Sequence, residues 1–279
     1  MGLFEDRVSI EFNYFDQLTK DALFQVPMDP ASGFGLQYRN VGKISNKGIE
    51  LAIYAQFLQT EDISASARFS ISTLTNKVES LGGSAPFSLS SFTFLPRRVE
   101  EGYPLGVFRV NVPIKDADGN YTGDYETKLF GNALPEQSGT FSLNITLFKD
   151  INISGLLEYA FGHQIVNLKK TLRYFNGAED AANVVPDGYS FESASIVWLE
   201  DADWIKIREI AINYRVPESI LKGLTVSASL RNVAEFGIKT SMLDPELNGF
   251  QSGAANTGGY GFLDISAPRQ LRFGLTYNF

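Results

Sequence analysis

Few side chains in this sequence have the types and spacing that enzyme or metal chemistry requires. The chain of 279 residues has no cysteine and a single histidine, His163. It cannot form a disulfide or a cysteine-based metal site, and it has few ways to build a Ser-His-Asp triad or a histidine-rich metal site. No pair of carboxylates stands out as the acid and base of a glycosidase. We therefore predict no enzyme activity and no cofactor, and we expect His163 to be a solvated or capping residue.

One acidic segment, Asp116-Ala117-Asp118-Gly119-Asn120, has the spacing with which a calcium loop begins. An EF-hand loop needs a bidentate glutamate at its twelfth position, which is Thr127 here. Asp-Gly is also a strong signal for a tight hairpin turn. We predict a turn at this segment, and a weak surface calcium site stays open as the alternative.

Aromatic residues in the polar connecting segments are the remaining candidates for ligand binding. A ring can stack on the apolar C–H face of a sugar, and it can equally anchor loops on one another or against a partner protein. Both interpretations stay open for Phe92, Phe94, Tyr103, Tyr189 and Tyr260.

Strands must position these residues, because apolar and polar residues alternate along much of the chain. At the C-terminus, polar or small residues alternate with Leu271, Phe273, Leu275, Tyr277 and Phe279. Successive side chains of a strand point to opposite faces, so one face of this segment is apolar. Alternation of this kind predicts eight strands, near 8–14, 49–57, 63–71, 141–147, 151–159, 204–214, 224–230 and 271–279.

The apolar parity changes between Ile207 and Ile210. A β-bulge adds one residue to one strand and shifts the alternation in this way. We predict a bulge here, or an extension of the strand beyond the lipid.

Short and long connections alternate between these strands. Short links join the strands near 58–62, 149–150 and 217–223, and long loops lie near 18–47, 75–139, 162–202 and 234–267. Transmembrane up-and-down β-barrels combine tight periplasmic turns with long extracellular loops in this manner. The pattern predicts an all-β fold, a transmembrane antiparallel up-and-down β-barrel with its long loops outside the cell.

The composition of the chain excludes further classes of protein. The net charge is −8, which disfavours binding to a phosphate backbone, and an aromatic content of 13% disfavours a disordered chain. No apolar run reaches the roughly 18 residues of a transmembrane helix. Mean hydropathy is −0.08, a neutral value that is also typical of barrels, since only every second residue faces lipid.

Several stretches resemble the C-terminal barrel of TonB-dependent outer-membrane transporters, in particular the SusC/RagA type. Six of them follow in the family's order: Asn40–Leu51, Asn76-Lys77-Val78 with Gly82-Gly83, Glu101–Gly106, Trp204–Ile210 with Asn213-Tyr214 and Pro217, Arg231-Asn232 with Asp244-Pro245-Glu246, and Pro268-Arg269 through Tyr277-Asn278-Phe279. The resemblance covers most of the chain.

The resemblance implies that residues 1–279 are the C-terminal portion of a larger barrel of about 22 strands, without the plug domain. It further implies a place in the outer membrane of a Gram-negative bacterium of the Bacteroidota kind, and energy-coupled uptake of a large nutrient, with an oligosaccharide favoured and a peptide possible. The partners implied are a SusD-like surface lipoprotein, the TonB complex acting through the N-terminal part, the barrel-insertion machinery and outer-membrane lipid. Phe273, Leu275, Tyr277 and Phe279 resemble the signal that such barrels present for membrane insertion.

Two other classes stay open from the residues alone. The eight strands could close into a self-contained barrel that acts as an adhesin or a small pore, since eight strands are enough for closure. They could also form a soluble β-sandwich that binds carbohydrate, with the apolar rows packed between two layers.

Overall fold

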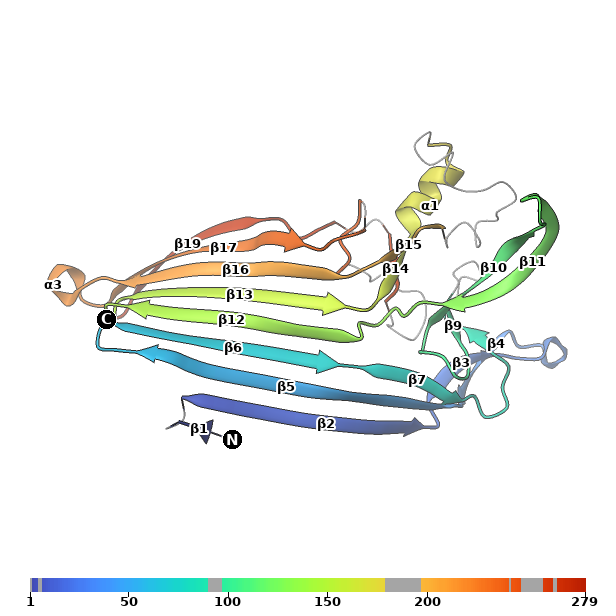
Figure 1. The fold of residues 1–279 in the computed structure, drawn as a ribbon, viewed down its shortest axis with the longest axis horizontal. Helices are drawn as coiled ribbons and strands as arrows, with labels where there is room; N and C mark the ends of the chain where they lie inside the picture. The colour runs from blue at the N-terminus through green and yellow to red at the C-terminus, as the bar shows by residue number, and fades with distance from the viewer. Residues whose placement is uncertain are drawn as a thin grey trace.

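The computed structural model describes residues 2–4, 7–89, 97–178, 197–240, 242–246, 258–262 and 265–279. Most of them belong to a long antiparallel sheet and to a group of smaller elements at one end of it (Figure 1). Among the described residues, no helix is long and apolar enough to cross a bilayer.

All eight predicted strands are present and lie side by side in sequence order. They are β2 (Val8–Lys20), β5 (Lys43–Gln59), β6 (Ile63–Thr73), β12 (Gln137–Leu147), β13 (Ile151–Phe161), β16 (Trp204–Arg215), β17 (Leu224–Phe236) and β19 (Gln270–Tyr277). Two short strands, β1 (Gly2–Leu3) and β7 (Thr75–Ser80), pair with β2 and β5. Each neighbouring pair on the main path is antiparallel, as an up-and-down meander requires.

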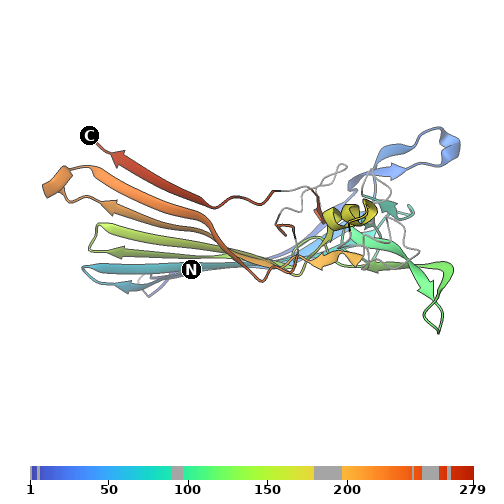
Figure 2. The same cartoon turned by 90° about the horizontal axis from the view of Figure 1, so that it is seen from above.

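The register puts the apolar rows on one face of the sheet. Ile10 lies opposite Ile53, which lies opposite Phe69, and the row continues through Phe141 to Leu157. Figure 2 shows this part of the sheet as a single curved layer. Phe12 is 65% exposed and Phe273 is 78% exposed, because no second layer of the described chain covers this face. The soluble β-sandwich is therefore wrong, since a sandwich would bury these rows.

The sheet is open between its first and last strands. Its path begins at β1 and β2 and ends at β19, and no pairing joins the two edges within the described residues. These eight strands thus do not form the self-contained closed barrel that was the other alternative. Unpaired N–H and C=O groups at two edges are costly in lipid, so such a sheet requires further strands.

Short turns and long connections lie at opposite ends of the strands (Figure 1). One end holds the links at 60–62 and 148–150 and the link that contains α3 (Glu218–Leu221). The opposite end holds β3 (Leu23–Pro27), η1 (Pro30–Ser32), β4 (Leu36–Asn40), β8 (Phe87–Ser88), β9 (Arg97–Val99), β10 (Val107–Lys115), β11 (Tyr121–Phe130), β14 (Gln164–Asn167), α1 (Leu168–Phe175), β15 (Leu199–Asp201) and β18 (Tyr260–Gly261).

The long connections, which the sequence predicts as loops, therefore contain regular secondary structure. The connection predicted at 18–47 contains the ends of β2 and β5 and a β3–β4 hairpin. That at 75–139 contains β7 and a four-stranded sheet of β8 to β11. These strands pair mostly with neighbours inside their own connection. They are also short, so the alternation of apolar and polar residues in the sequence does not predict them.

The buried core lies among these connections and not under the main sheet. One cluster joins β3, β7 and β9 through residues such as Phe24, Val78 and Val99. A second joins Phe108, Val166, Leu168 and Tyr260. No second layer of the described chain covers the apolar face of the main sheet. The buried core of the described chain is therefore formed by the connections.

Candidate functional site

The polar face of the main sheet carries the candidate site. One row on this face crosses seven strands, from Glu11 on β2 through Ser70, Thr140 and Glu158 to Lys206 and Glu235. The neighbouring row runs from Asn13 through Glu50, Ser72, Ser138 and Ala160 to Trp204. Alternation thus gathers carboxylates, hydroxyls and one indole ring on the side opposite the apolar rows.

A hollow of about 710 Å³ lies on this face and is lined by both rows. Hydroxyl groups form its middle, where the Oγ of Ser70 and the Oγ1 of Thr140 are 2.7 Å apart. At one side Asn13 donates to Glu50 over 3.1 Å. At the other side are Glu158 and Trp204. The hydroxyl, amide and carboxylate groups of this lining can accept and donate hydrogen bonds.

A bulge in β16 brings two consecutive charged residues to this face. The pairing with β13 passes from Leu157–Ile207 to Leu156–Glu209, and the pairing with β17 passes from Ile207 to Glu209 in the same way. Arg208 is the extra residue on β16, and its side chain reaches Glu158 on the polar face. The predicted bulge is confirmed, and its physical effect is that Arg208 and Glu209 both lie on the polar face, whereas strict alternation would put them on opposite faces.

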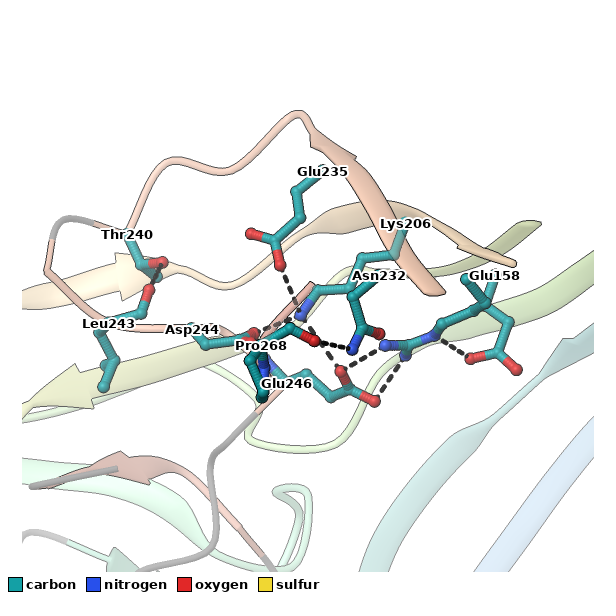
Figure 3. A network of polar contacts seen from close by, with 10 residues as sticks. Glu158, Lys206, Asn232, Glu235, Thr240, Leu243, Asp244, Glu246 and Pro268 are labelled. Carbon is teal, nitrogen blue, oxygen red and sulfur yellow. Dashed lines mark hydrogen bonds and ion pairs between the residues drawn. The ribbon is translucent and has the colours of Figure 1, made fainter. Parts of the chain in front are cut away.

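Arg208 and Lys206 bind two carboxylates of the connection that follows β17 (Figure 3). The Nη1 and Nη2 atoms of Arg208 donate to the two oxygens of Glu246 over 2.8 and 2.5 Å, and its Nε donates to Glu158 over 2.6 Å. Lys206 Nζ lies 2.5 Å from Asp244 and 3.1 Å from Glu246. We call the six charged residues Glu158, Lys206, Arg208, Glu235, Asp244 and Glu246 the bulge network.

Two cations of the bulge network lie against the ring of Trp204. The guanidinium of Arg208 lies 5.0 Å from the ring centroid and Lys206 Nζ lies 5.6 Å from it. Both are cation–π contacts, and Trp204 is only 9% exposed. Burial by itself would raise the pKa of the Glu246 carboxyl, but its hydrogen bonds from Arg208 and Lys206 outweigh burial and lower this pKa. Glu246 is therefore held as an anion.

A second polar centre ties the connections to one another. Arg97 is buried, donates from Nε to the Gly106 carbonyl over 3.2 Å and also donates to the Gly258 carbonyl. Its guanidinium lies 5.9 Å from the ring centroid of Tyr260. Burial lowers the pKa of Arg97 to about 10, a value at which it stays charged at neutral pH.

The structure separates the aromatic candidates. Tyr260 is buried, with its ring edge-on to Phe108 at a centroid distance of 6.4 Å, so it anchors connections on one another and does not offer a free ring. Tyr103 is 39% exposed, and stacking on a sugar and anchoring of loops or of a partner protein both stay predictions for it. Phe92, Phe94 and Tyr189 lie outside the described residues.

The structure also tests the predictions for His163 and for the acidic segment 116–120. The sequence predicts that His163 is a solvated or capping residue; it is buried, with 3% of its surface exposed, so the solvated alternative is wrong. It lies between the β13 end and β14, where the connections pack closely. Residues 116–120 form the turn of the β10–β11 hairpin, in which the Asp116 Oδ1 accepts from the Asp118 and Asn120 amides. No group of three or more His, Cys, Asp or Glu in the described ranges is placed to hold a metal ion.

The sequence alone does not identify the bulge network as a site, although two of its features point to it. The parity change from Ile207 to Ile210 marks the bulge, and Asp244-Pro245-Glu246 belongs to one of the stretches that resemble the transporter family. The C-terminal residues Phe273 and Leu275 lie exposed on the apolar face, as an insertion signal requires, and this role stays a prediction.

Known proteins with similar sequences were found over most of the chain. The family model described as "TonB dependent receptor-like, beta-barrel" matches residues 3–233. TonB-dependent receptor P26 of Formosa agariphila is 23% identical over 333 aligned positions, covering 100% of this chain and 33% of the relative. TonB-dependent receptor P3 of the same organism is 23% identical and covers 79% of this chain and 26% of the relative.

Solved structures agree with the fold. The structure of the RagAB peptide transporter superposes with a TM-score of 0.79 at 22% identity, over 100% of this chain and 34% of that chain. The RagAB peptide importer in its open-open state gives a TM-score of 0.74 at 21% identity. The chain thus spans about a third of the length of these relatives.

Proposed function

The chain belongs to the TonB-dependent receptor β-barrel family, and from this premise we propose that it forms wall and extracellular connections of a transporter for a large nutrient. Its family places it in the outer membrane of a Gram-negative bacterium. In the proposed mechanism the polar face lines the passage, the long connections capture the nutrient, and TonB supplies the energy through an N-terminal part. We propose that a SusD-like surface lipoprotein covers the extracellular side and that the barrel-insertion machinery recognises the C-terminal strand.

One observation carries this proposal: the two faces of the main sheet have opposite chemistry along its whole width. The apolar rows are exposed on one face, where lipid would cover them, and a hollow whose lining includes hydroxyl, amide and carboxylate groups lies on the other. A polar wall of this kind lets a hydrogen-bonding nutrient pass without leaving water-like surroundings.

We propose an oligosaccharide as the nutrient, because the residues that line the hollow include four with aliphatic hydroxyl groups, Ser70, Ser72, Ser138 and Thr140. Hydroxyls act as donors and acceptors and match the same groups on a sugar. A peptide is the second candidate, since the RagAB structures that share this fold carry the description of a peptide transporter.

Uptake by cells tests the proposed energy coupling and distinguishes the two candidate nutrients. The transporter that contains this chain would be produced in the outer membrane of a host with and without TonB. Cells would receive labelled maltoheptaose in one arm and a labelled peptide digest in the other. We expect uptake that requires TonB, with maltoheptaose preferred. TonB-independent uptake would contradict energy coupling, and a preference for the digest would select the peptide alternative.

A further inference from the structure

The apolar face of the main sheet becomes charged where β2, β5 and β7 approach the long connections (Figure 1). Tyr14 lies opposite Ile49, and both are exposed. Residues two apart along a strand share a face, so the next pair on this face is Asp16 and Lys47. Their side chains form an ion pair of 2.8 Å. The continuous apolar rows of β2 and β5 therefore end at Tyr14 and Ile49, and a charged region begins directly beyond them.

Lys47 lies at the height where the hydrocarbon of a bilayer ends. Phe57 is 63% exposed on the same strand, near the short turns. The stretch from Lys47 to Phe57 spans about 33 Å at about 3.3 Å per residue. At the tilt of about 40° that is usual for outer-membrane barrels, this stretch rises about 25 Å, which is the height of their apolar band. Charged side chains beyond Lys47 therefore lie at the level of the lipid head groups, on the side of the long connections.

Two lysines lie further along the same face without a counter-ion. Lys20 on β2 is directly opposite Lys43 on β5, and both residues are exposed. Neither lysine forms an ion pair with a residue in the described part of the chain. Like charges directly opposite each other destabilise a sheet. This cross-strand pair therefore favours a bound anion.

Two more lysines border this pair. Lys47 and Lys77 are exposed on β5 and β7, and each forms one ion pair, with Asp16 at 2.8 Å and with Glu79 at 3.0 Å. Within the described residues, two carboxylates are thus bound to four lysines, which leaves an excess of positive charge. We call these four residues the lysine group: Lys20, Lys43, Lys47 and Lys77.

The lysine group is confined to one sector of the sheet and points outward. On the neighbouring strands β6, β12 and β13 the same face ends with the uncharged residues Thr73, Gln137 and Phe161. The opposite face of β5 and β7 is covered, because Ile44 and Val78 are buried in the core of the connections. The lysine side chains are therefore accessible from the side of the sheet that lipid borders.

We propose that the lysine group binds the phosphate head group of an anionic lipid. The acyl chains of this lipid lie along Leu18, Tyr14 and Ile49, which are 50%, 58% and 41% exposed. Cations directly beyond an apolar surface match such a lipid in both charge and polarity. The inference requires the outer-membrane position of the family, and it holds whatever nutrient is transported.

Crosslinking to a lipid probe tests the site. The full transporter that contains this chain would be reconstituted in phosphatidylcholine nanodiscs with a trace of phosphatidylglycerol that carries a diazirine in its acyl chain. A diazirine phosphatidylcholine serves in the parallel arm, and crosslinked peptides are mapped by mass spectrometry. We expect phosphatidylglycerol to be favoured on the β2 and β5 peptides. Lys43→Gln should lower this preference about fivefold, because a lysine near an anionic membrane surface contributes about 1 kcal/mol.

Two variants separate the charge of the lysine group from other effects. Lys43→Arg keeps the charge, so we expect the preference of the parent. Lys222→Gln is the matched control, because Lys222 is also exposed but lies at the short-turn end. Lys20→Gln repeats the test if Lys43→Gln does not insert, which heat-modifiable gel mobility shows.

The proposal also requires that the preference fall in 0.5 M salt, since exposed charges are screened. Equal crosslinking by the two lipids in the parent would overturn the proposal, as would the same loss in Lys222→Gln. Loss of the preference on addition of millimolar inorganic phosphate would show that the lysine group recognises free phosphate, and this result would also overturn the assignment to a lipid.

Discussion

Tyr159 lies across Gly139, the residue directly opposite on the neighbouring strand, and leaves no room for a side chain there. A Cβ atom at Gly139 would stand 2.5 Å from the Tyr159 hydroxyl oxygen and 2.1 Å from the Ser70 carbonyl oxygen. The second contact is to backbone, so it cannot be relieved by a rotamer change. The glycine allows an aromatic ring to pack against the sheet between β12 and β13.

We therefore predict that Gly139→Ala destabilises the folded protein by about 1–3 kcal/mol, the usual effect of overpacking. Gly155→Ala is the matched control on β13, because nothing lies within 4 Å of a Cβ built there. Urea unfolding of the detergent-solubilised protein measures both. Equal midpoints for the two variants would show that Tyr159 moves aside at no cost.

The uncovered apolar face leads to a prediction about membrane insertion. Leu275 and Thr276 are neighbours on β19 that point to opposite faces, and Leu275 is 76% exposed. A lysine on the lipid face of a barrel costs about 2–4 kcal/mol near the bilayer centre, and one on the polar face costs little. We expect Leu275→Lys to reduce the fraction that inserts into liposomes and Thr276→Lys to leave it near the parent value. Insertion is read from heat-modifiable gel mobility, and a larger loss for Thr276→Lys would reverse our assignment of the faces.

The buried histidine makes stability depend on pH. Burial lowers the pKa of His163 below its ordinary value of 6.5, and the nearby Asp203 carboxylate opposes this only in part. As the pH falls below 6.5, the unfolded chain binds a proton before the folded chain does, so protonation favours unfolding. Stability should be complete above pH 6.5, fall as the pH drops from there toward the folded-state pKa, and level off below it.

His163→Gln removes this contribution and isolates it from the carboxylates that titrate at lower pH. We expect the urea midpoint of the parent to fall more steeply than that of His163→Gln as the pH passes from neutral to mildly acidic. Parallel curves for the two proteins would mean that His163 is accessible to protons in the folded state.

The hairpin tip at residues 116–120 depends on one carboxylate. Asp116 Oδ1 accepts from the Asp118 amide over 3.0 Å and from the Asn120 amide over 2.9 Å. Asp116→Ala should remove both hydrogen bonds and lower the local stability of the hairpin tip by about 0.5–1.5 kcal/mol for each bond. Hydrogen exchange of these two amides should then be faster. Asp118→Ala is the control. Strong protection of the hairpin on addition of Ca²⁺ would instead support the calcium site.

Alternation in the sequence was sufficient to predict the main sheet, its eight strands and the bulge in β16. A strand places successive side chains on opposite faces wherever it lies, so rows such as Leu271 to Tyr277 carry their own structural information. The short links also followed from the sequence, since two strands separated by a few residues can only pair as a hairpin.

The connections and the bulge network were decided by tertiary structure. Arg208 and Glu246 are 38 residues apart in sequence, and Arg97 and Gly258 are 161 residues apart. Their contacts depend on where the strands carry the connections, which no local pattern records. The same holds for Tyr260 and His163, whose burial follows from neighbours supplied by other connections. Period-two patterning is a property of single strands, whereas an ion-pair network or a packed connection is a property of their arrangement in space.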